Sequence, residues 1–422
     1  MGFYKKFMKN IEKFNFSIIN EGSTKIYIHN IDKNAVPSKS MTVFYNSRME
    51  INRDITNLSI LVYNKLFNKN SLGIVDPMAA SGVSSIRMLK ECKNIKRIFI
   101  NDINPVAVKI LHKNLSLNDL DNHPAQIKIS QKDANLLLNE IAQNSYRQSN
   151  YKVKKPNIIS IDPFGTPNLY LDSAFKAIQS NNGLLCTTAT DTPVLFGIRP
   201  KTCLRKYFSK PLHTDYCKEI GARILIHFIS RIANVNKLGI IPLLTFYSSH
   251  FLRIFSITFK DKRKISKFFE NYGYIIHCNN CGYRTTIKNN ILEVLHECPV
   301  CKNHGKIDYA GPLWIGKIHD EKFIKELINF SEQSHFKNKK RISKLLGLIQ
   351  EEYKMPTSYY NIHKLCQNLK ISMIPKLEIL INKIKEKGYK CSRTHFDYLS
   401  FKSNLDNEGI KECLLELQKE GI

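Results

Sequence analysis

The stretch Asn157–Pro167 reads Asn-Ile-Ile-Ser-Ile-Asp-Pro-Phe-Gly-Thr-Pro, and it decides the fold of this chain. A short apolar run that ends in turn residues is typical of an interior strand of a parallel sheet. Ligands of open α/β sheets bind beyond the carboxyl ends of such strands, so Asp162 and Phe164 are expected at the mouth of a site. A carboxylate that accepts hydrogen bonds and a ring that stacks suit an amino group on a flat base. The alternative is an ordinary turn in which Asp162 caps a helix and Phe164 joins the core.

The same strand-and-turn pattern occurs three times upstream. The strand Gly73–Met78 leads into a turn of small residues, Ala79–Arg87, which lets a ligand approach the backbone. A second strand ends at Asp102, about 20 residues beyond that turn, where an acid can bind ribose hydroxyls. A third strand, Gln126–Ser130, is followed by Asp133, which is placed to bind an adenine amino group. The chain therefore predicts an α/β, Rossmann-like doubly wound domain that binds a nucleoside-containing cofactor. The turn has a single glycine, which disfavours a nicotinamide dinucleotide.

Four cysteines have the spacing of a zinc ribbon. They form two C-x₂-C pairs separated by 16 residues: Cys278, Cys281, Cys298 and Cys301. Two such pairs close a tetrahedral site, and four thiolates leave no open position on the metal. The expected zinc is therefore structural. The alternatives are a coincidence of spacing and a redox pair.

Composition limits the partners and the compartment. The 422 residues include 64 Lys and Arg against 36 Asp and Glu, a net charge of +28. Such an excess favours a nucleic acid as partner, although a skewed genome composition also enriches lysine. Eleven cysteines, an odd number, and a start without an apolar signal region indicate a reducing compartment, the cytoplasm. No apolar run reaches ~18 residues, so no membrane span is expected.

The chain is expected to form two domains. Residues 1–265 would hold an N-terminal arm and the doubly wound domain, and residues 266–422 a smaller α+β domain. A lysine-rich break at 260–267 separates them, and the zinc ribbon spans 278–301. The tail has the pattern of a winged-helix-like module. Its segment Arg393–His395 either binds phosphate or attaches the tail to the body of the protein.

The N-terminal arm contains two local patterns. Glu21–Ile28 predicts a short hairpin, and Val43–Asp54 combines aromatics and two arginines without a clear period. We expect the second segment to be irregular and to be followed by a helix over Ile55–Phe67. It is interpreted either as a lid on the cofactor site or as a surface loop.

Several of these motifs, in this order, resemble the tRNA (guanine-26) N2-dimethyltransferase family. The resemblance extends from about Glu21 to Asn404, and its motifs are long and distinctive. They are Phe44–Asn46 with Asn52–Asp54, Asp162–Pro167, Thr188–Asp191, Glu219–Leu225, the cysteine ribbon and Ser392–His395. The resemblance implies a class I methyltransferase domain that uses S-adenosyl-L-methionine, and a C-terminal domain that binds tRNA.

The resemblance also implies roles for individual residues. The catalytic acid and the stacking aromatic correspond to Asp162 and Phe164, and Phe44 matches a second aromatic near the target base. Cofactor-binding positions of the family correspond to Arg53, Arg87, Asp102, Asp133 and Ala134. Two departures occur: the turn before Arg87 lacks the Gly-x-Arg pattern that is frequent in the family, and Ser47 stands where proline is common.

The implied reaction is the transfer of one or two methyl groups to the exocyclic N2 of guanine 26 in tRNA. The resemblance suggests no protein partner, and a monomer is expected. A DNA or RNA amino-methyltransferase that modifies another base would carry a similar Asp-Pro-Pro-aromatic loop. A non-catalytic zinc-ribbon RNA-binding protein would explain the charge but not the ordered motifs at the strand ends. The sequence leaves open the number of methyl groups, the tRNA substrates and modification of a neighbouring guanine.

Overall fold

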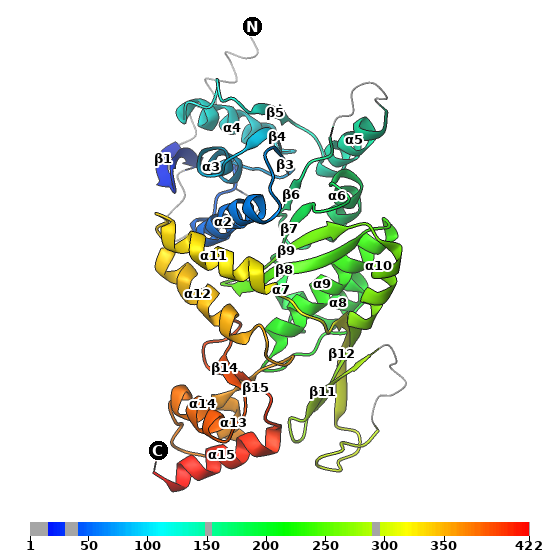
Figure 1. Ribbon diagram of the computed structural model, residues 1–422, viewed down its shortest axis with the longest axis vertical. Helices are drawn as coiled ribbons and strands as arrows, with labels where there is room; N and C mark the ends of the chain where they lie inside the picture. The colour runs from blue at the N-terminus through cyan, green and yellow to red at the C-terminus, as the bar shows by residue number, and fades with distance from the viewer. Residues whose placement is uncertain (1–15, 30–40, 148–153, 289–295, 422) are drawn as a thin grey trace. The chain divides into compact units, whose positions relative to one another are not determined.

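The computed structural model describes residues 16–29, 41–147, 154–288 and 296–421 (Figure 1). The first 15 residues, whose composition was considered above, lie outside the described part. The chain forms two compact units, each built from two segments of the sequence. Unit 1 comprises Met1–Thr187 and Asn329–Ile342, and unit 2 comprises Thr188–Ile328 and Ser343–Ile422. This division differs from the predicted boundary between residues 265 and 266. The two predicted domains stay a prediction.

Unit 1 is built on parallel strands in the order β5-β4-β3-β6-β7, as expected for a doubly wound sheet. The bounds are β3 (Leu72–Asp76), β4 (Ile95–Asn101), β5 (Gln126–Ser130), β6 (Ile158–Ile161) and β7 (Leu184–Ala189), the last of which ends in unit 2. Every residue of β3 and β6 is buried. Central parallel strands are covered on both faces, which explains their nearly continuous apolar sequences.

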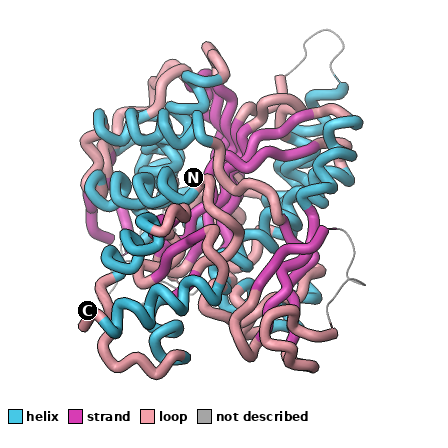
Figure 2. The backbone as a smooth tube through the Cα atoms, turned by 60° about the horizontal axis from the view of Figure 1, so that its bottom comes forward, coloured by secondary structure: helices cyan, strands magenta, loops and turns pink. Residues whose placement is uncertain are grey.

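Helices connect these strands and surround the sheet (Figures 1 and 2). They are α3 (Val83–Glu91), α4 (Pro105–Leu117), α5 (Ala134–Arg147), the short η2 (Asn168–Tyr170) and α6 (Leu171–Ala177). The start of α4 follows from its sequence: Asn104 Oδ1 accepts the Val106 N–H at 2.9 Å, and Pro105 occupies the first turn.

The N-terminal hairpin is present as β1 (Phe16–Glu21) and β2 (Thr24–His29), paired antiparallel. Asn114 of α4 anchors it, because its Oδ1 accepts the Tyr27 N–H at 2.6 Å. The prediction that Val43–Asp54 is irregular was wrong over its second half. After η1 (Ser47–Met49), helix α2 begins at Glu50 and ends at Leu66. The first turns of α2 bury polar side chains, and an apolar period therefore does not reveal them.

Unit 2 begins with α7 (Thr192–Leu195), α8 (Pro200–Tyr207) and α9 (Cys217–Val235). An antiparallel pair, β8 (Gly239–Ser248) and β9 (Phe251–Phe259), follows, and then α10 (Lys262–Phe268) and η3 (Phe269–Asn271). The ribbon is a three-stranded antiparallel sheet in the order β11-β10-β12. Its strands are β10 (Tyr272–Cys278), β11 (Arg284–Lys288) and β12 (Ile307–Trp314).

The tail folds around its own apolar core. Its three-stranded sheet has the order β13-β15-β14, with β13 (Tyr360–Asn361), β14 (Cys391–Arg393) and β15 (Ser400–Ser403). Its helices are α13 (Ile362–Asn368), α14 (Leu377–Glu386) and α15 (Asn407–Lys419), and α11 (Glu321–Gln333) and α12 (Lys339–Glu352) precede it. Two helices and a following strand were expected here. The winged-helix-like interpretation stays a prediction.

The structure favours one of the two interpretations of Arg393–His395. Thr394 Oγ1 donates to Glu352 Oε2 at 2.6 Å, and buried His395 contacts Glu352 Oε1 through Nδ1. The Nζ of Lys402 lies 3.7 Å from Glu352 Oε2 and 2.8 Å from Oε2 of Glu219, on α9. This buried polar network attaches the tail to α12 and α9, so Thr394 and His395 do not face a phosphate. Within the described residues, no helix combines the length and apolar character that a membrane span needs.

Candidate functional site

Asp162 lies where the sequence places it, directly after β6, and its side chain is exposed to solvent. The interpretation that it caps a helix finds no support, because the only hydrogen bond assigned to it within the described chain is from an amide. The Nδ2 of Asn52, on α2, donates to Asp162 Oδ2 at 3.4 Å. Asn52 is itself 2% exposed, and its Oδ1 has no hydrogen-bond partner in the described residues. The structure therefore presents an available carboxylate, held by one amide, at the carboxyl edge of the sheet.

Phe164 and Phe44 meet beside this carboxylate. Phe164 is 45% exposed, so it does not join the core. The two ring centroids lie 4.5 Å apart, and the ring planes are at 81°. Because the rings touch edge to face, a flat base can stack on one of them but cannot lie between them.

Asn101, the last residue of β4, holds the strand ends together. Its side chain is fully buried: Nδ2 donates to Pro77 O at 3.0 Å and to Lys132 O at 2.8 Å, and Oδ1 accepts from Lys132 N at 3.0 Å. One amide thus fixes the loops that follow β3, β4 and β5. Sequence analysis missed this residue, because an Asn before an Asp resembles any strand end.

The predicted cofactor acids Asp102 and Asp133 stand on these loops. Asp102 Oδ2 accepts from Ala80 N and Oδ1 from Asn104 N, both at 2.8 Å. Burial raises the pKa of Asp102, and these two backbone hydrogen bonds oppose the rise. Asp133 caps α5, because its Oδ1 accepts from Asn135 N at 2.9 Å. Ala134, the first residue of α5, is buried behind it.

A third acid of this edge, Asp76 at the end of β3, was not predicted as a site residue. It is 4% exposed, and Ser85 Oγ donates to its Oδ2 at 2.6 Å. Burial raises the pKa of Asp76 to about 6, and the charges of Asp162 and Asp102 add to the rise, whereas the Ser85 hydroxyl opposes it. Asp76 therefore lies close enough to Asp162 and Asp102 for their charges to disfavour its ionisation. A shifted carboxyl at a strand end is typical of a functional site.

The arginines implied as cofactor residues occupy a different environment. Arg53 donates through Nε and Nη2 to the two carboxylate oxygens of Glu21, both at 2.6 Å. Arg87 has no exposed side-chain surface; it contacts Asp54 Oδ1 at 2.6 Å, and Glu21 Oε1 and Glu91 Oε1 both at 3.0 Å. These five residues form a buried ion network that joins β1, α2 and α3. A cofactor-binding role for Arg53 and Arg87 stays a prediction.

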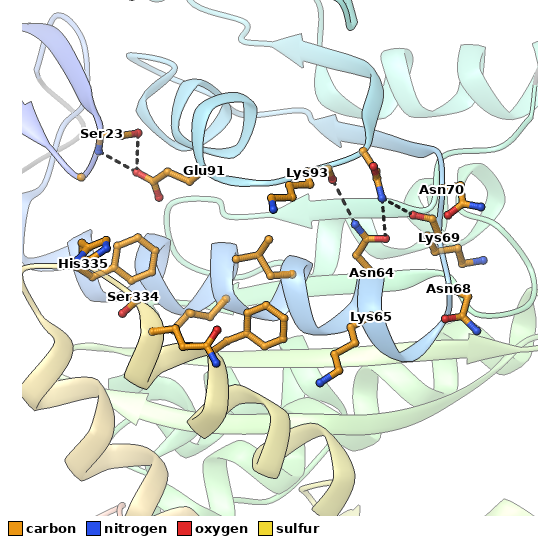
Figure 3. A pocket seen from close by; sticks show the side chains of 17 residues that line it. Ser23, Asn64, Lys65, Asn68, Lys69, Asn70, Glu91, Lys93, Ser334 and His335 are labelled. Carbon is orange, nitrogen blue, oxygen red and sulfur yellow. Dashed lines mark hydrogen bonds between the residues drawn. The ribbon is translucent and has the colours of Figure 1, made fainter.

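Unit 1 also contains a cavity of about 860 Å³ between α2 and residues 330–336 (Figure 3). None of the predicted site residues lines it. Its one carboxylate, Glu91, accepts hydrogen bonds from Ser23, Asn57 and Arg87. With that acid occupied, the residues that line the cavity offer no carboxylate available for proton transfer.

The four ribbon cysteines come together in unit 2. Their sulfur atoms lie within 4.8 Å of one another, with Cys278 and Cys301 at 3.8 Å and Cys281 and Cys298 at 3.6 Å. A tetrahedron of thiolates around zinc, at about 2.3 Å per bond, has edges of about 3.8 Å. Asn280 Nδ2 donates to Cys301 Sγ and lowers the pKa of that thiol to about 6, which favours the thiolate form. The donor set and its geometry fit a structural zinc ion.

Comparison with known proteins extends over nearly the whole chain. The family model of the N2,N2-dimethylguanosine tRNA methyltransferases matches residues 22–415. The tRNA (guanine(26)-N(2))-dimethyltransferase of Methanosphaera stadtmanae is 36% identical over 96% of this chain and 98% of that protein. The tRNA (guanine(26)-N(2)/guanine(27)-N(2))-dimethyltransferase of Aquifex aeolicus is 31% identical over 95% of this chain and 96% of that protein.

A solved structure agrees with this relationship. The structure of Trm1 from Pyrococcus horikoshii in complex with S-adenosyl-L-methionine has a TM-score of 0.79 and 29% identity. The match covers 94% of this chain and 99% of that one. The α/β architecture, the acid and the aromatic after β6, and the cysteine ribbon thus occur in a chain that belongs to the N2,N2-dimethylguanosine tRNA methyltransferase family.

Proposed function

We propose that this protein is a tRNA methyltransferase that methylates the exocyclic N2 of guanine at position 26, using S-adenosyl-L-methionine. The observation that carries the proposal is the exposed Asp162 beside Phe164 at the carboxyl edge of the sheet, in a chain of this family. The named relatives carry out this reaction.

The residues at the sheet edge fit the cofactor. The turn after β3 consists of small residues, and Ser81 in it has a buried hydroxyl without a hydrogen-bond partner in the described residues. Asp102 keeps free lone pairs after its two backbone hydrogen bonds, and these suit ribose hydroxyls. Asp133 and Ala134 would hold the base end. When bound, S-adenosyl-L-methionine supplies an electrophilic methyl group on a sulfonium.

Asp162 would act directly on the target amine. The N2 of guanine is a poor nucleophile, because its lone pair is delocalised into the ring. Asp162 accepts a hydrogen bond from the NH₂ group, orients it, and takes up the proton that the amine loses. Asn52 holds the carboxylate through its 3.4 Å contact. Much of the acceleration should come from this alignment.

The aromatics would offset the cost of removing guanine from the tRNA stack, which is about a few kcal/mol. Stacking on one ring contributes about 1–3 kcal/mol. Since Phe164 is exposed and lies two residues after Asp162, it is our choice for the stacking ring, with Phe44 at the base edge.

The remaining features of the proposal concern the whole protein. We assign zinc to the four cysteines as a structural ion, and tRNA binding to the C-terminal half, residues 266–422. We expect the enzyme to work as a monomer in the cytoplasm. Support for a reducing compartment comes from the odd number of cysteines, eleven in all, four of which have the spacing of a zinc ribbon.

A methylation assay tests the function. The purified protein is incubated with methyl-labelled S-adenosyl-L-methionine and an unmodified tRNA transcript, followed by nucleoside analysis. We expect label in N2-methylguanosine or N2,N2-dimethylguanosine, and its loss in a transcript with adenosine at position 26. Equal labelling of that control, or label on another base, would contradict the proposal. The ratio of the two nucleosides shows whether one or two methyl groups are added.

A further inference from the structure

Helices α8 and α9 are neighbours in unit 2 (Figure 1). Helix α8 and the adjoining part of α9 carry a set of exposed cationic and apolar side chains. We call this set the α8 surface. Its members are Arg199, Lys201, Leu204, Arg205 and Phe208 from α8 and its ends, and Arg231 from α9. Phe208 is 66% exposed and Leu204 55% exposed. The surface lies outside residues 266–422, to which tRNA binding was assigned above.

The backbone of Phe208 is unusual for a bulky residue. It stands at the C-terminal end of α8 with φ 53° and ψ 42°, the left-handed conformation that glycine or asparagine normally adopts there. Both neighbours fix it in place: Tyr207 is buried and its hydroxyl donates to Asp191 at 2.8 Å, and Ser209 is buried and donates to Pro312 O at 2.7 Å. The ring is thus held outward at a conformational cost. Among the non-glycine residues with positive φ in the described chain, Phe208 is the one aromatic residue, and strain of this kind is frequent at functional sites.

The charge of the surface has one sign. Residues 192–214 contain five Lys and Arg and no Asp or Glu, and residues 220–260 also contain no acid. Lys206 pairs with Asp191 at 3.2 Å, and Lys210 with Asp308 at 2.6 Å. Within the described residues, the side chains of Arg199, Lys201 and Arg205 make no ion pair. Their charge is therefore available to a partner.

Aromatic and cationic groups meet at the end of this surface. The Arg231 guanidinium carbon lies 5.5 Å from the centroid of the Phe208 ring. A cation beside an exposed ring can hold a phosphate next to a stacked base. An acidic protein would satisfy the cations but would not require an exposed ring in a strained conformation.

We propose that the α8 surface binds the tRNA substrate, with Phe208 stacking on an unpaired base and Lys201, Arg205 and Arg231 contacting the flanking phosphates. This inference rests on the proposed function. The α8 surface would add a second contact area to the one assigned to residues 266–422, and it would bind nucleotides other than the target guanine.

The first test replaces the ring and relieves the strain at once. Asparagine tolerates the left-handed conformation, so Phe208→Asn should leave the melting temperature unchanged or raise it. The dissociation constant for unmodified tRNA, measured by filter binding, should increase about 5- to 150-fold, and Phe208→Tyr should restore it. A Phe208→Asn protein that binds tRNA like the wild type would overturn the proposal.

The second test substitutes two exposed residues, and we expect neither substitution to affect folding. Lys201→Ala with Arg205→Ala should weaken tRNA binding and lower the slope of log affinity against log salt by about 1.5. Lys96→Ala with Lys154→Ala removes the same charge from exposed positions of unit 1, outside both the α8 surface and residues 266–422, and serves as control. If both double variants show the same slope, the α8 surface does not contact phosphate and the proposal fails.

The two proposals can fail separately. If the wild-type protein transfers no methyl group to tRNA, the proposed function is wrong. If the wild type methylates and binds tRNA while the α8 variants match the control, only this inference is wrong. S-adenosyl-L-methionine affinity, measured by calorimetry, should be the same in all variants.

Discussion

Glu21 and Asp162 are both carboxylates of unit 1, but they differ in solvent exposure and in the hydrogen bonds that they accept. Glu21 is 2% exposed and accepts hydrogen bonds from Arg53, Arg87 and Tyr45. Asp162 is exposed and has one long hydrogen bond, from Asn52. A carboxylate whose lone pairs are all occupied holds structure, whereas one that faces solvent with free lone pairs can act on a substrate. The comparison separates the ion network from the reactive edge.

The strongest test of this separation is Asp162→Ala. We expect methyl transfer to fall about 10²- to 10⁴-fold, because the proton acceptor is lost. Urea unfolding and S-adenosyl-L-methionine affinity should be unchanged, since the side chain is exposed. Asp172→Ala removes another exposed carboxylate of unit 1 and should leave the rate unaffected. If Asp162→Ala transferred methyl groups at nearly the wild-type rate, Asp162 would not be the carboxylate that acts on the substrate.

The second test addresses the network through Arg87→Met. Removing this fully buried guanidinium leaves Asp54 and Glu91 without their main partner, which should cost about 3–5 kcal/mol of unfolding free energy. Lys90→Met on the same helix is exposed and should change stability by about 0.5 kcal/mol or less. Preserved stability with a large loss of cofactor affinity would instead make Arg87 a cofactor residue.

Asp76 lies between the two cases, because it is buried but stands at the reactive edge. Its pKa is raised from 3.8 to about 6, so its ionisation opposes folding as the pH rises from about 4 through 6. The wild type should therefore lose stability relative to Asp76→Asn over this range, by up to about 3 kcal/mol. Urea unfolding at pH 4 and pH 7.5 measures the difference. A difference that does not grow with pH would mean that Asp76 is ionised without penalty.

The smallest expected effect separates the two aromatics. Because only one ring can stack on the base, Phe164→Ala should reduce kcat/KM for tRNA about 5- to 150-fold. Phe44→Ala should reduce kcat/KM by the equivalent of about 1 kcal/mol, which is the free energy of an edge-to-face aromatic contact. Equal losses for the two variants would indicate that the rings separate and enclose the base.

The strands and helix α2 show which parts of the fold the sequence pattern predicts and which it does not. Short apolar runs and turn residues predicted β3 to β6 and the positions of Asp102, Asp133 and Asp162 after their strands. Helix α2 was predicted to start at Ile55 and starts at Glu50, because its first turns bury Asn52, Arg53 and Asp54 in polar contacts. Buried polar residues have no apolar period, so the pattern placed the start of the helix five residues too late.

The sequence by itself determined the doubly wound sheet, the acid and aromatic after β6, the cysteine ribbon and the family, because each depends on the local order of residues. The tertiary structure alone decided which charged groups are occupied. It joined Arg53 and Arg87 to carboxylates distant in sequence, gave Asp76 its shifted pKa, and directed Thr394 and His395 toward Glu352. The physical reason is that burial and hydrogen bonding depend on neighbours in space, which a local motif does not specify.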